Sequence, residues 1–483
     1  MSLSLSMSAA LSGLQAQSRA AGLISSNVAN ALTEGYGRRE LSLSVRSLGG
    51  TGQGVDVTGV RRITDAVLIG DRRATEASKA SAEALAAFFS TVEAAVGSPG
   101  DDPSLSTRVN RLDSAILAAT ARPESEAVLA EVLDAAVALS DHLADASATV
   151  RQERERADRQ IAVSVDRLNG SLQQIADLNA QILRQYSSGQ DPSGLIDNRQ
   201  QLIDDLSEIL PLREVEGENG QVGLFSLGGA VLLQGRPATF GFTAAGVITA
   251  DMTMASGALS GLTLNGKPID VMAETGPIAG GSLAAAFAIR DQWAPEAQDR
   301  LDGVARDLID RFAAADTTLA SGAPGLFTDA GGSYDPADQV GLAGRIEVNA
   351  WADPEQGGAL WRLRDGLGAV AEGAPGNAAG LSSLHDALTT LQEPASDAFS
   401  TGERDFSSLV GDLASLSASA RLGAETELSY QSGKLESLRT EELAMGVDSD
   451  QETQRLLLVE QAFAANAQVL KTVDELIRLL MEI

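Results

Sequence analysis

The stretch of this sequence with the clearest potential for chemistry is 261–267, GLTLNGK, which has the spacing of a phosphate-binding loop. Such a loop needs Ser or Thr after the lysine to ligate magnesium, and a following helix whose N-terminus faces the phosphates. Here Pro268 stands after the lysine, and a strand-like apolar run follows it. Asn-Gly between two apolar runs is a signal for a tight hairpin. We therefore predict a β-hairpin at this position.

Other side chains that catalyse reactions or bind metals are sparse. The chain has no cysteine, and its two histidines, His142 and His385, lie in separate helical patterns. The glycines at 49–54 do not follow the dinucleotide-binding pattern, and 329–335 holds too few carboxylates for a calcium-binding loop. Most acid–base and nucleophilic catalysis depends on His or Cys. We therefore expect no catalytic residue, no cofactor and no metal, and we do not expect an enzyme.

Composition narrows the range of partners. The formal net charge is −30 and the isoelectric point is near 4.4, so we expect neither nucleic acid nor an anionic membrane as a partner. Apolar residues make up 44% of the 483 residues, but aromatic residues only 4%. The core must therefore be aliphatic and rich in alanine, which suits the packing of helices on helices. The N-terminus has no basic segment followed by an apolar run, so we expect no secretory signal peptide.

The elements that organise the chain are at its two ends. The segment 453–483 has no Gly or Pro, and its apolar positions alternate by three and four, as in a coiled coil. At 1.5 Å per residue it would form a helix of roughly 45 Å. The predicted contact positions are Leu456, Val459, Phe463, Asn466, Leu470, Val473, Ile477 and Leu480. Asn466 either sets the register of the coiled coil or lies at a surface or lumen position.

A second, weaker heptad pattern lies at the N-terminus. Its positions are Met7, Leu11, Leu14, Ser18, Ala21, Ser25, Val28 and Leu32. Gly13 and Gly22 each cost such a helix about 1 kcal/mol relative to alanine. We predict that the two terminal helices pair as a coiled coil and that both contribute to an assembly interface. From the N-terminal helix, we assign to this interface Leu11, Leu14, Ala21 and Val28.

The chain between these ends is nested. Residues 39–63 alternate like a hairpin with a glycine loop at 49–54, 65–210 are helical in pattern, and strand signals begin after Pro211. Mixed charges at 151–160 predict a solvated helix face. The fold class is mainly α with a β-rich insertion, in a nested multidomain arrangement. The predicted division is 1–38 with 446–483 as a terminal coiled-coil domain; 39–64 as an extended hairpin-like connector; 65–210, 281–320 and 375–445 as a helical domain; and 211–280 with 321–374 as a β-rich outer domain.

Motifs at both ends resemble a known family. The turn after the N-terminal helix follows a pattern close to SxNIANxxTxGYxR, carried by Asn27, Asn30, Thr33, Gly35, Tyr36 and Arg38. This is similar to the start of the flagellar rod, hook and hook-associated proteins. Residues 464–470, preceded by 446–448, resemble the C-terminus of the hook-associated members. Two inner segments, 195–202 and 280–283, resemble segments of the same members.

The resemblance implies a structural subunit of the bacterial flagellum at the junction between hook and filament. It implies export through the flagellar type III apparatus without a cleaved signal peptide, assembly as a helical ring, and an extracellular location. The implied partners are copies of the chain itself, the hook protein, the second hook–filament junction protein, and an export chaperone at the C-terminal helix. The alternative is a secreted coiled-coil adhesin or effector that uses the same export route.

Overall fold

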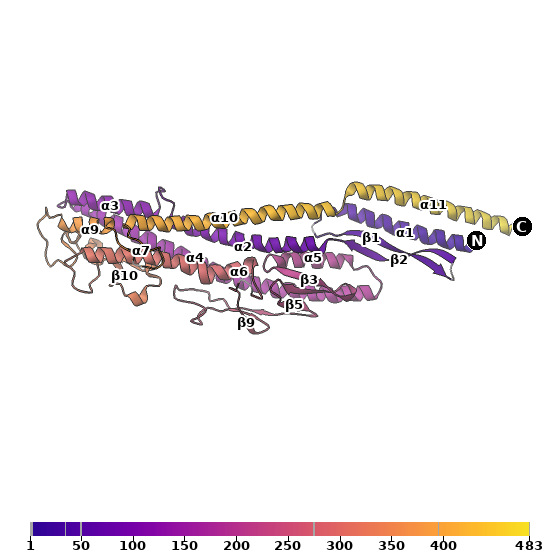
Figure 1. Ribbon diagram of the computed structural model, residues 1–483, viewed down its shortest axis with the longest axis horizontal. Helices are drawn as coiled ribbons and strands as arrows, with labels where there is room; N and C mark the ends of the chain where they lie inside the picture. Colours follow the sequence, from indigo (N-terminus) through magenta and orange to yellow (C-terminus); the bar gives the residue numbers. More distant parts are fainter. Residues whose placement is uncertain (1–2, 34, 49–50, 274–275, 395, 483) are drawn as a thin grey trace.

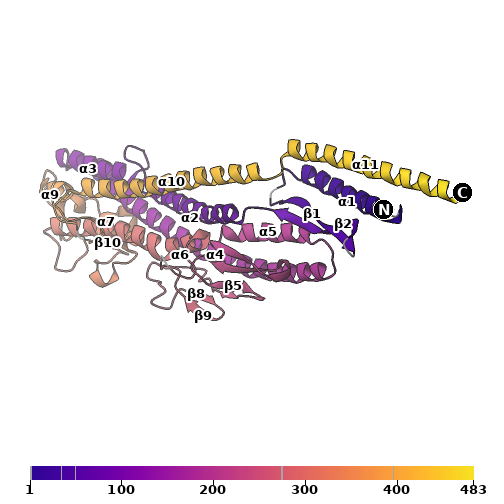
Figure 2. The ribbon, with the colours of Figure 1, turned by 45° about the vertical axis from the view of Figure 1, so that its right-hand side comes forward.

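The protein is an elongated rod in which the longest helices run along the long axis (Figure 1). This computed structural model describes residues 3–33, 35–48, 51–273, 276–394 and 396–482. Both chain ends lie at the same end of the rod, where the first and last helices are side by side (Figures 1 and 2). The predicted fold class is confirmed, because a mainly helical chain carries a strand-rich insertion and its terminal helices pair.

The terminal unit is our name for four elements at this end of the rod: α1 (Leu3–Ala29), β1 (Arg38–Leu48), β2 (Thr51–Ile63) and α11 (Ser449–Met481). α1 lies between α11 and the hairpin (Figure 1). The predicted hairpin forms, with β1 antiparallel to β2. The glycine loop was predicted too long, because Gly52 and Gly54 belong to β2, while Gly49 and Gly50 lie outside the described residues. Gly54 is needed inside the strand because its backbone has φ +109° and lies against Ser12 of α1.

The helical body consists of α2 (Ala66–Val96), α3 (Leu105–Ala121), α4 (Glu126–Ser187), α5 (Ser193–Ser207), α7 (Ala294–Ala315) and α10 (Phe406–Met445). A hydrophobic cluster joins the first half of α4 to α2, α3, α7 and α10. The prediction of a solvated face at 151–160 was wrong in part. Arg154 and Asp158 of α4 are buried. Asp158 is buried because it is the carboxylate partner of Arg290, which belongs to a π-helical turn at Ile289–Trp293. Arg290 Nη1 lies 2.8 Å from Asp158 Oδ1, and both side chains are buried.

The strand-rich insertion packs against the second half of α4, α5 and α6 (Gly281–Ala288) through another hydrophobic cluster. One sheet contains β3 (Leu212–Glu216), β4 (Val222–Ser226), β5 (Val231–Gln234) and β6 (Arg236–Pro237); the other contains β7 (Phe240–Gly241), β8 (Leu262–Leu264) and β9 (Lys267–Ile269). The hairpin predicted from the glycine–lysine motif is confirmed. Asn265 and Gly266 both have positive φ, as a two-residue turn requires, and β9 rather than a helix follows them.

The remaining elements close the end of the rod that is farthest from the chain termini (Figure 1). They are β10 (Phe327–Asp329), β11 (Ile346–Val348), α8 (Trp361–Asp365) and α9 (Ala379–Thr389). β10 and β11 pair with each other and join the first hydrophobic cluster, not the one beneath the other two sheets. α10 runs unbroken through Gly411, Gly423 and Gly433. The division of the chain into domains stays a prediction.

Candidate assembly interface

Asn27, the first residue of the family-like motif, is a buried hub near the end of α1. Its amide nitrogen donates hydrogen bonds to the carbonyl oxygen of Arg39, at 2.9 Å, and to Glu452 Oε2, at 3.0 Å. Its amide oxygen accepts from the Arg39 backbone N–H, at 3.0 Å, and from the Tyr36 hydroxyl, at 2.9 Å. An asparagine offers both donors and acceptors in one plane, which a carboxylate or an aliphatic side chain cannot. One side chain therefore joins α1, the following turn, β1 and α11.

Glu452 is the member of this hub that sequence reasoning missed. It lies in the first turn of α11 and is only 1% exposed. Arg455 Nη1 lies 3.0 Å from its Oε1, and Arg38 Nη1 lies 3.7 Å from the same oxygen. A buried carboxylate needs such partners, and an acidic residue also suits the positive end of a helix dipole. The only sequence signal was an acidic residue in the first turn of a helix, which is too common to select this one.

The other motif residues shape the turn that follows α1. Asn30 Nδ2 donates to the Ser26 carbonyl oxygen at 2.9 Å, and Thr33 Oγ1 donates to Asn30 Oδ1 at 3.3 Å. Gly35 has φ +76°, a conformation that favours glycine. Glu34, which occupies the variable position between Thr33 and Gly35 of the motif, lies outside the described residues. These residues therefore hold the local geometry of the turn.

The inner face of α11 has the predicted spacing. Val473 is buried, and the neighbouring positions Leu456, Val459, Asn466, Leu470 and Ile477 are partly covered by the terminal unit. Phe463 and Leu480, which belong to the same predicted set, are 44% and 62% exposed. Asn466 lies directly over Gly13 of α1, where a Cβ atom on the glycine would come within 2.8 Å of its Nδ2. This close approach links the polar position in the heptad to one glycine of the partner helix.

Several of the predicted N-terminal heptad positions are exposed in the single chain. Met7, Leu11 and Val28 are 42%, 50% and 42% exposed, while Leu14 and Ala21 are partly buried. The covered face of α1 instead carries small residues, Ala10 and Ala16, together with Ile24 and Asn27. α1 is covered on one side by α11 and on another by the hairpin, and small residues let both approach closely. The predicted pairing of the helices is confirmed, and the role of the individual positions in assembly stays a prediction.

α11 also carries a second apolar row, on the flank of its inner face. At 100° per residue, Leu458, Val469 and Leu476 lie on one side of the helix, and they are 65%, 45% and 44% exposed. Leu457, Leu479 and Met481 add further exposed apolar surface to the same helix. A helix that is paired on one side and still apolar on another has a face for a further partner.

The terminal unit is joined to the helical body by arginine–carboxylate contacts. Arg39 of β1 and Arg62 of β2 both pair with Asp197 of α5, with Arg62 Nε 3.0 Å from Asp197 Oδ1. Asp197 lies in one of the inner family-like segments, but sequence reasoning gave it no role. Arg62 also donates to the carbonyl oxygen of Gly35, at 2.8 Å. The resembling turn and the resembling segment at 195–202 therefore meet in space.

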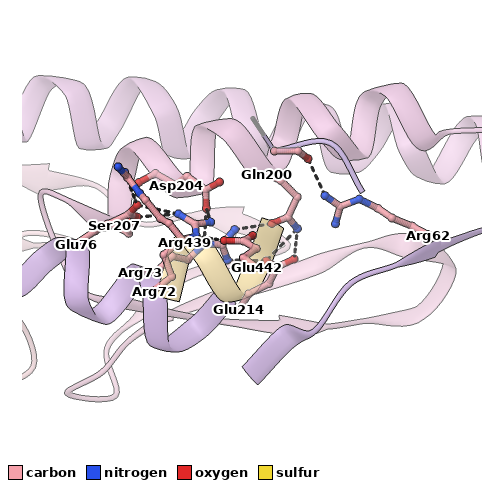
Figure 3. A network of polar contacts seen from close by, with 11 residues as sticks. Arg62, Arg72, Arg73, Glu76, Gln200, Asp204, Ser207, Glu214, Arg439 and Glu442 are labelled. Carbon is pink, nitrogen blue, oxygen red and sulfur yellow. Dashed lines mark hydrogen bonds and ion pairs between the residues drawn. The ribbon is translucent and has the colours of Figure 1, made fainter. Parts of the chain in front are cut away.

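A larger network ties α2, α5 and α10 together beside this joint (Figure 3). Arg72 of α2 pairs with Glu76, Asp204 and Glu442, at 2.9, 2.9 and 2.6 Å. Burial lowers the pKa of the Arg72 guanidinium, but the surrounding carboxylates, Asp204 first, raise it by more, so the pKa lies above its usual range. Arg439 of α10 adds a contact of 3.0 Å to Glu76. The arrangement is a structural clamp between helices.

Neither histidine belongs to the network of Arg72. His142 is partly buried on α4, and burial lowers its pKa. His385 Nδ1 lies 2.7 Å from Asp113 Oδ1, which links α9 to α3. Within the described ranges, no group of three or more His, Cys, Asp or Glu residues is placed to hold a metal ion. Of the helices described, none is long and apolar enough to cross a membrane.

Comparison with known proteins gives three family matches. Residues 84–324 match the family described as flagellar hook-associated protein FlgK helical domain. Residues 444–483 match the flagellar basal body rod FlgEFG protein C-terminal family, and residues 7–36 match the flagella basal body rod protein family. The two terminal matches include α11 and most of α1, and the inner match covers most of the helical body and the strand-rich insertion.

Curated relatives carry the same name. The chain is 25% identical over 236 residues to flagellar hook-associated protein 1 of Escherichia coli K12, which covers 47% of this chain and 43% of that protein. It is 26% identical over 233 residues to the protein of that name from Bacillus subtilis 168, which covers 46% of each. The match therefore spans less than half the length of these relatives.

A solved structure, the flagellar hook junction protein FlgK from Burkholderia pseudomallei, aligns with a TM-score of 0.44 and 20% identity, over 54% of this chain and 46% of that one. The family matches at both ends and in the middle, together with relatives of one name, agree with each other. The chain belongs to the FlgK family of flagellar hook-associated proteins.

Proposed function

We propose that this chain is a structural subunit of the bacterial flagellum that forms the junction between hook and filament. The observation that carries the proposal is the terminal unit, in which α1 and α11 cover one face of each other and leave a second apolar face open. In α1 that open face carries Leu11 and Val28, and in α11 it carries Leu458, Val469 and Leu476. The two open rows belong to different helices, so the α11 row of one copy can pack on the α1 row of the next. Repeated in one direction, this contact is heterologous and builds a ring or helix.

The proposed partners follow from this surface and from the family. Copies of the chain fill the open rows, and the hook protein and the second hook–filament junction protein lie on either side of the ring. Before assembly, an export chaperone covers α11. Export through the flagellar type III apparatus places the protein outside the cell without a cleaved signal peptide. We propose that the predicted interface residues of both helices lie in the contacts between subunits.

The test is a charge placed on the open row of α11. Leu476→Glu should leave the fold intact but abolish filaments, because an ionised carboxylate in a packed apolar contact is strongly unfavourable. Gln468→Glu is the matched control, since Gln468 is an exposed polar residue of the same helix that lies outside the row of Leu458, Val469 and Leu476. Electron microscopy of cells that carry each variant in place of the native chain would count hooks and filaments. We expect hooks without filaments for Leu476→Glu and normal filaments for Gln468→Glu.

Removal of residues 453–483 tests the class of protein more broadly. A junction subunit without α11 leaves hooks that carry no filament, and labelled native protein lies at the hook–filament boundary. An adhesin or effector exported by the same route would leave filaments normal after this deletion. Normal filaments would therefore reject the proposed function.

A further inference from the structure

The contact between the terminal unit and the rest of the molecule is polar. Two clusters of buried apolar residues form the hydrophobic core of the described chain. Neither cluster includes a residue of α1, β1, β2 or α11. Two short backbone segments connect the parts, 64–65 between β2 and α2 and 446–448 between α10 and α11. Because no shared apolar core fixes the angle between the two parts, that angle depends on the polar contacts between them.

One carboxylate collects the ion pairs of this joint. Both oxygens of Asp197 are used: Arg62 Nε lies 3.0 Å from Oδ1, and Arg39 bonds to Oδ2. The three side chains are each about one-seventh exposed, at 15%, 15% and 14%. Arg39 is also the residue whose backbone is held by Asn27. Asp197 therefore forms ion pairs with both strands of the hairpin, next to Asn27, which joins α1 to α11.

An open cleft lies beside the ion pairs of Asp197. A cleft of about 270 Å³ lies between the turn at 31–38, the start of α2 and the end of α10. Its lining includes exposed apolar side chains: Leu32 is 96% exposed, Leu443 is 68% exposed and Met445 is 51% exposed. The terminal unit therefore has room to turn toward the end of α10.

We propose that Asp197 is the latch of a hinge. Its two ion pairs hold the terminal unit at the angle seen here, and their release lets the unit turn as a rigid piece about the two backbone segments. Exposed ion pairs contribute little to stability, and pairs that are partly covered contribute more only while both partners stay in place. Removal of one charge, or screening by salt, should therefore change the angle without unfolding either part.

Distances between spin labels measure this angle directly. The chain has no cysteine, so Gln461→Cys on α11 and Ser429→Cys on α10 give one labelled pair across the joint. A second pair, Gln461→Cys with Ser44→Cys on β1, lies inside the terminal unit. All three positions are exposed. At low salt, the native joint should give one narrow distance distribution for the pair across it.

Asp197→Asn should add a second, shifted distance to the pair across the joint and leave the inner pair unchanged. Molar salt should screen the ion pairs of Asp197 and produce the same shift in a chain that keeps Asp197. This second test therefore needs no substitution at Asp197. The matched control is Asp205→Asn, an exposed carboxylate on the same helix that lies 3.8 Å from Arg167. An unchanged distribution in Asp197→Asn would overturn the latch. Equal broadening of the inner pair would overturn it too, because the unit would then be unfolding.

Discussion

At the scale of single residues, the structure explains why a motif can be found in a sequence when its partners cannot. Asn27 stood out because of its neighbours in the chain, but its function depends on Glu452, which is 425 positions away. Asp197 stood inside a recognisable segment, but nothing in that segment indicates two arginines on a distant hairpin. Local turn chemistry, such as Asn265-Gly266, was predictable because all of its causes are local. Partners of buried polar groups were not, since burial is a property of the fold.

Asp302 of α7 is another buried carboxylate whose environment is set by the fold. It accepts hydrogen bonds from the Gly341 and Ala343 backbone N–H groups, at 2.7 and 2.8 Å, and from Gln298. Burial raises its pKa to about 6, although those bonds oppose the rise. The folded chain therefore holds a proton between roughly pH 4 and 6 that the unfolded chain has lost. Over that range the stability contributed by this group falls as pH rises.

We predict that acidification from pH 7.5 to 5 adds about 1 kcal/mol at Asp302 to the free energy of unfolding. Asp302→Asn removes this gain because the amide does not titrate. Urea unfolding of both chains at the two pH values would measure the difference, with Asp205→Asn as an exposed control. If the pH dependence of Asp302→Asn equals that of the native chain, Asp302 does not hold the extra proton.

At the scale of elements, the type of each terminal helix was predictable, but which side chains of α1 are covered was not. α1 has apolar or small residues on more than one side, so its periodicity fits two alternatives. The predicted positions Leu11 and Val28 are exposed, whereas Ala10, Ala16 and Ile24, which lie between the predicted positions, are buried, and Gly13 meets Asn466 of α11. α11 has one inner face with clear heptad spacing, on which Val473 is buried and Val459 and Asn466 are partly covered. The helical pattern of 65–210 was recognisable, but that α4 runs unbroken through 62 residues was not, and its buried charges were predicted to be solvated.

The close contact between Gly13 and Asn466 gives a prediction at this scale. Gly13→Val should weaken the pairing of α1 with α11 by about 1–3 kcal/mol, since a larger side chain must displace Asn466. Gly22→Val is the matched control, because a Cβ atom at Gly22 of the same helix meets nothing within 4 Å. Both changes replace glycine by the same residue, so their difference isolates the packing.

Urea unfolding followed by amide exchange in α1 and α11 would measure this difference. Asn466→Ala in the Gly13→Val background should recover part of the loss, as expected for two residues in contact. Equal effects of Gly13→Val and Gly22→Val would mean that Asn466 moves aside without cost. The register of the helix pair would then have another origin.

At the scale of the whole molecule, the nested order of the chain was predictable because helical and strand patterns alternate along it. The placement of the later strands was not. β10 and β11 lie beside the first half of α4, whereas the other strands of the insertion lie beside its second half. The 62 residues of α4 span both clusters, so one helix separates segments that sequence composition groups together. The polar joint was equally hidden, because it consists of side chains from three distant segments.

This organisation predicts unequal stability along the rod. α4 is buried along most of its length, whereas the buried residues described in α11 are Glu452 and Val473. Regions with few buried contacts open at lower free energy than the core does. Amide exchange of the free chain should therefore be at least about tenfold faster in 455–480 than in 128–182, a difference of about 1.4 kcal/mol. Assembly should protect 455–480 and leave 128–182 nearly unchanged, because the proposed contact covers the open apolar rows of the terminal unit. Equal protection in the free chain would show that α11 is already complete without a partner, and its open row would then need another explanation.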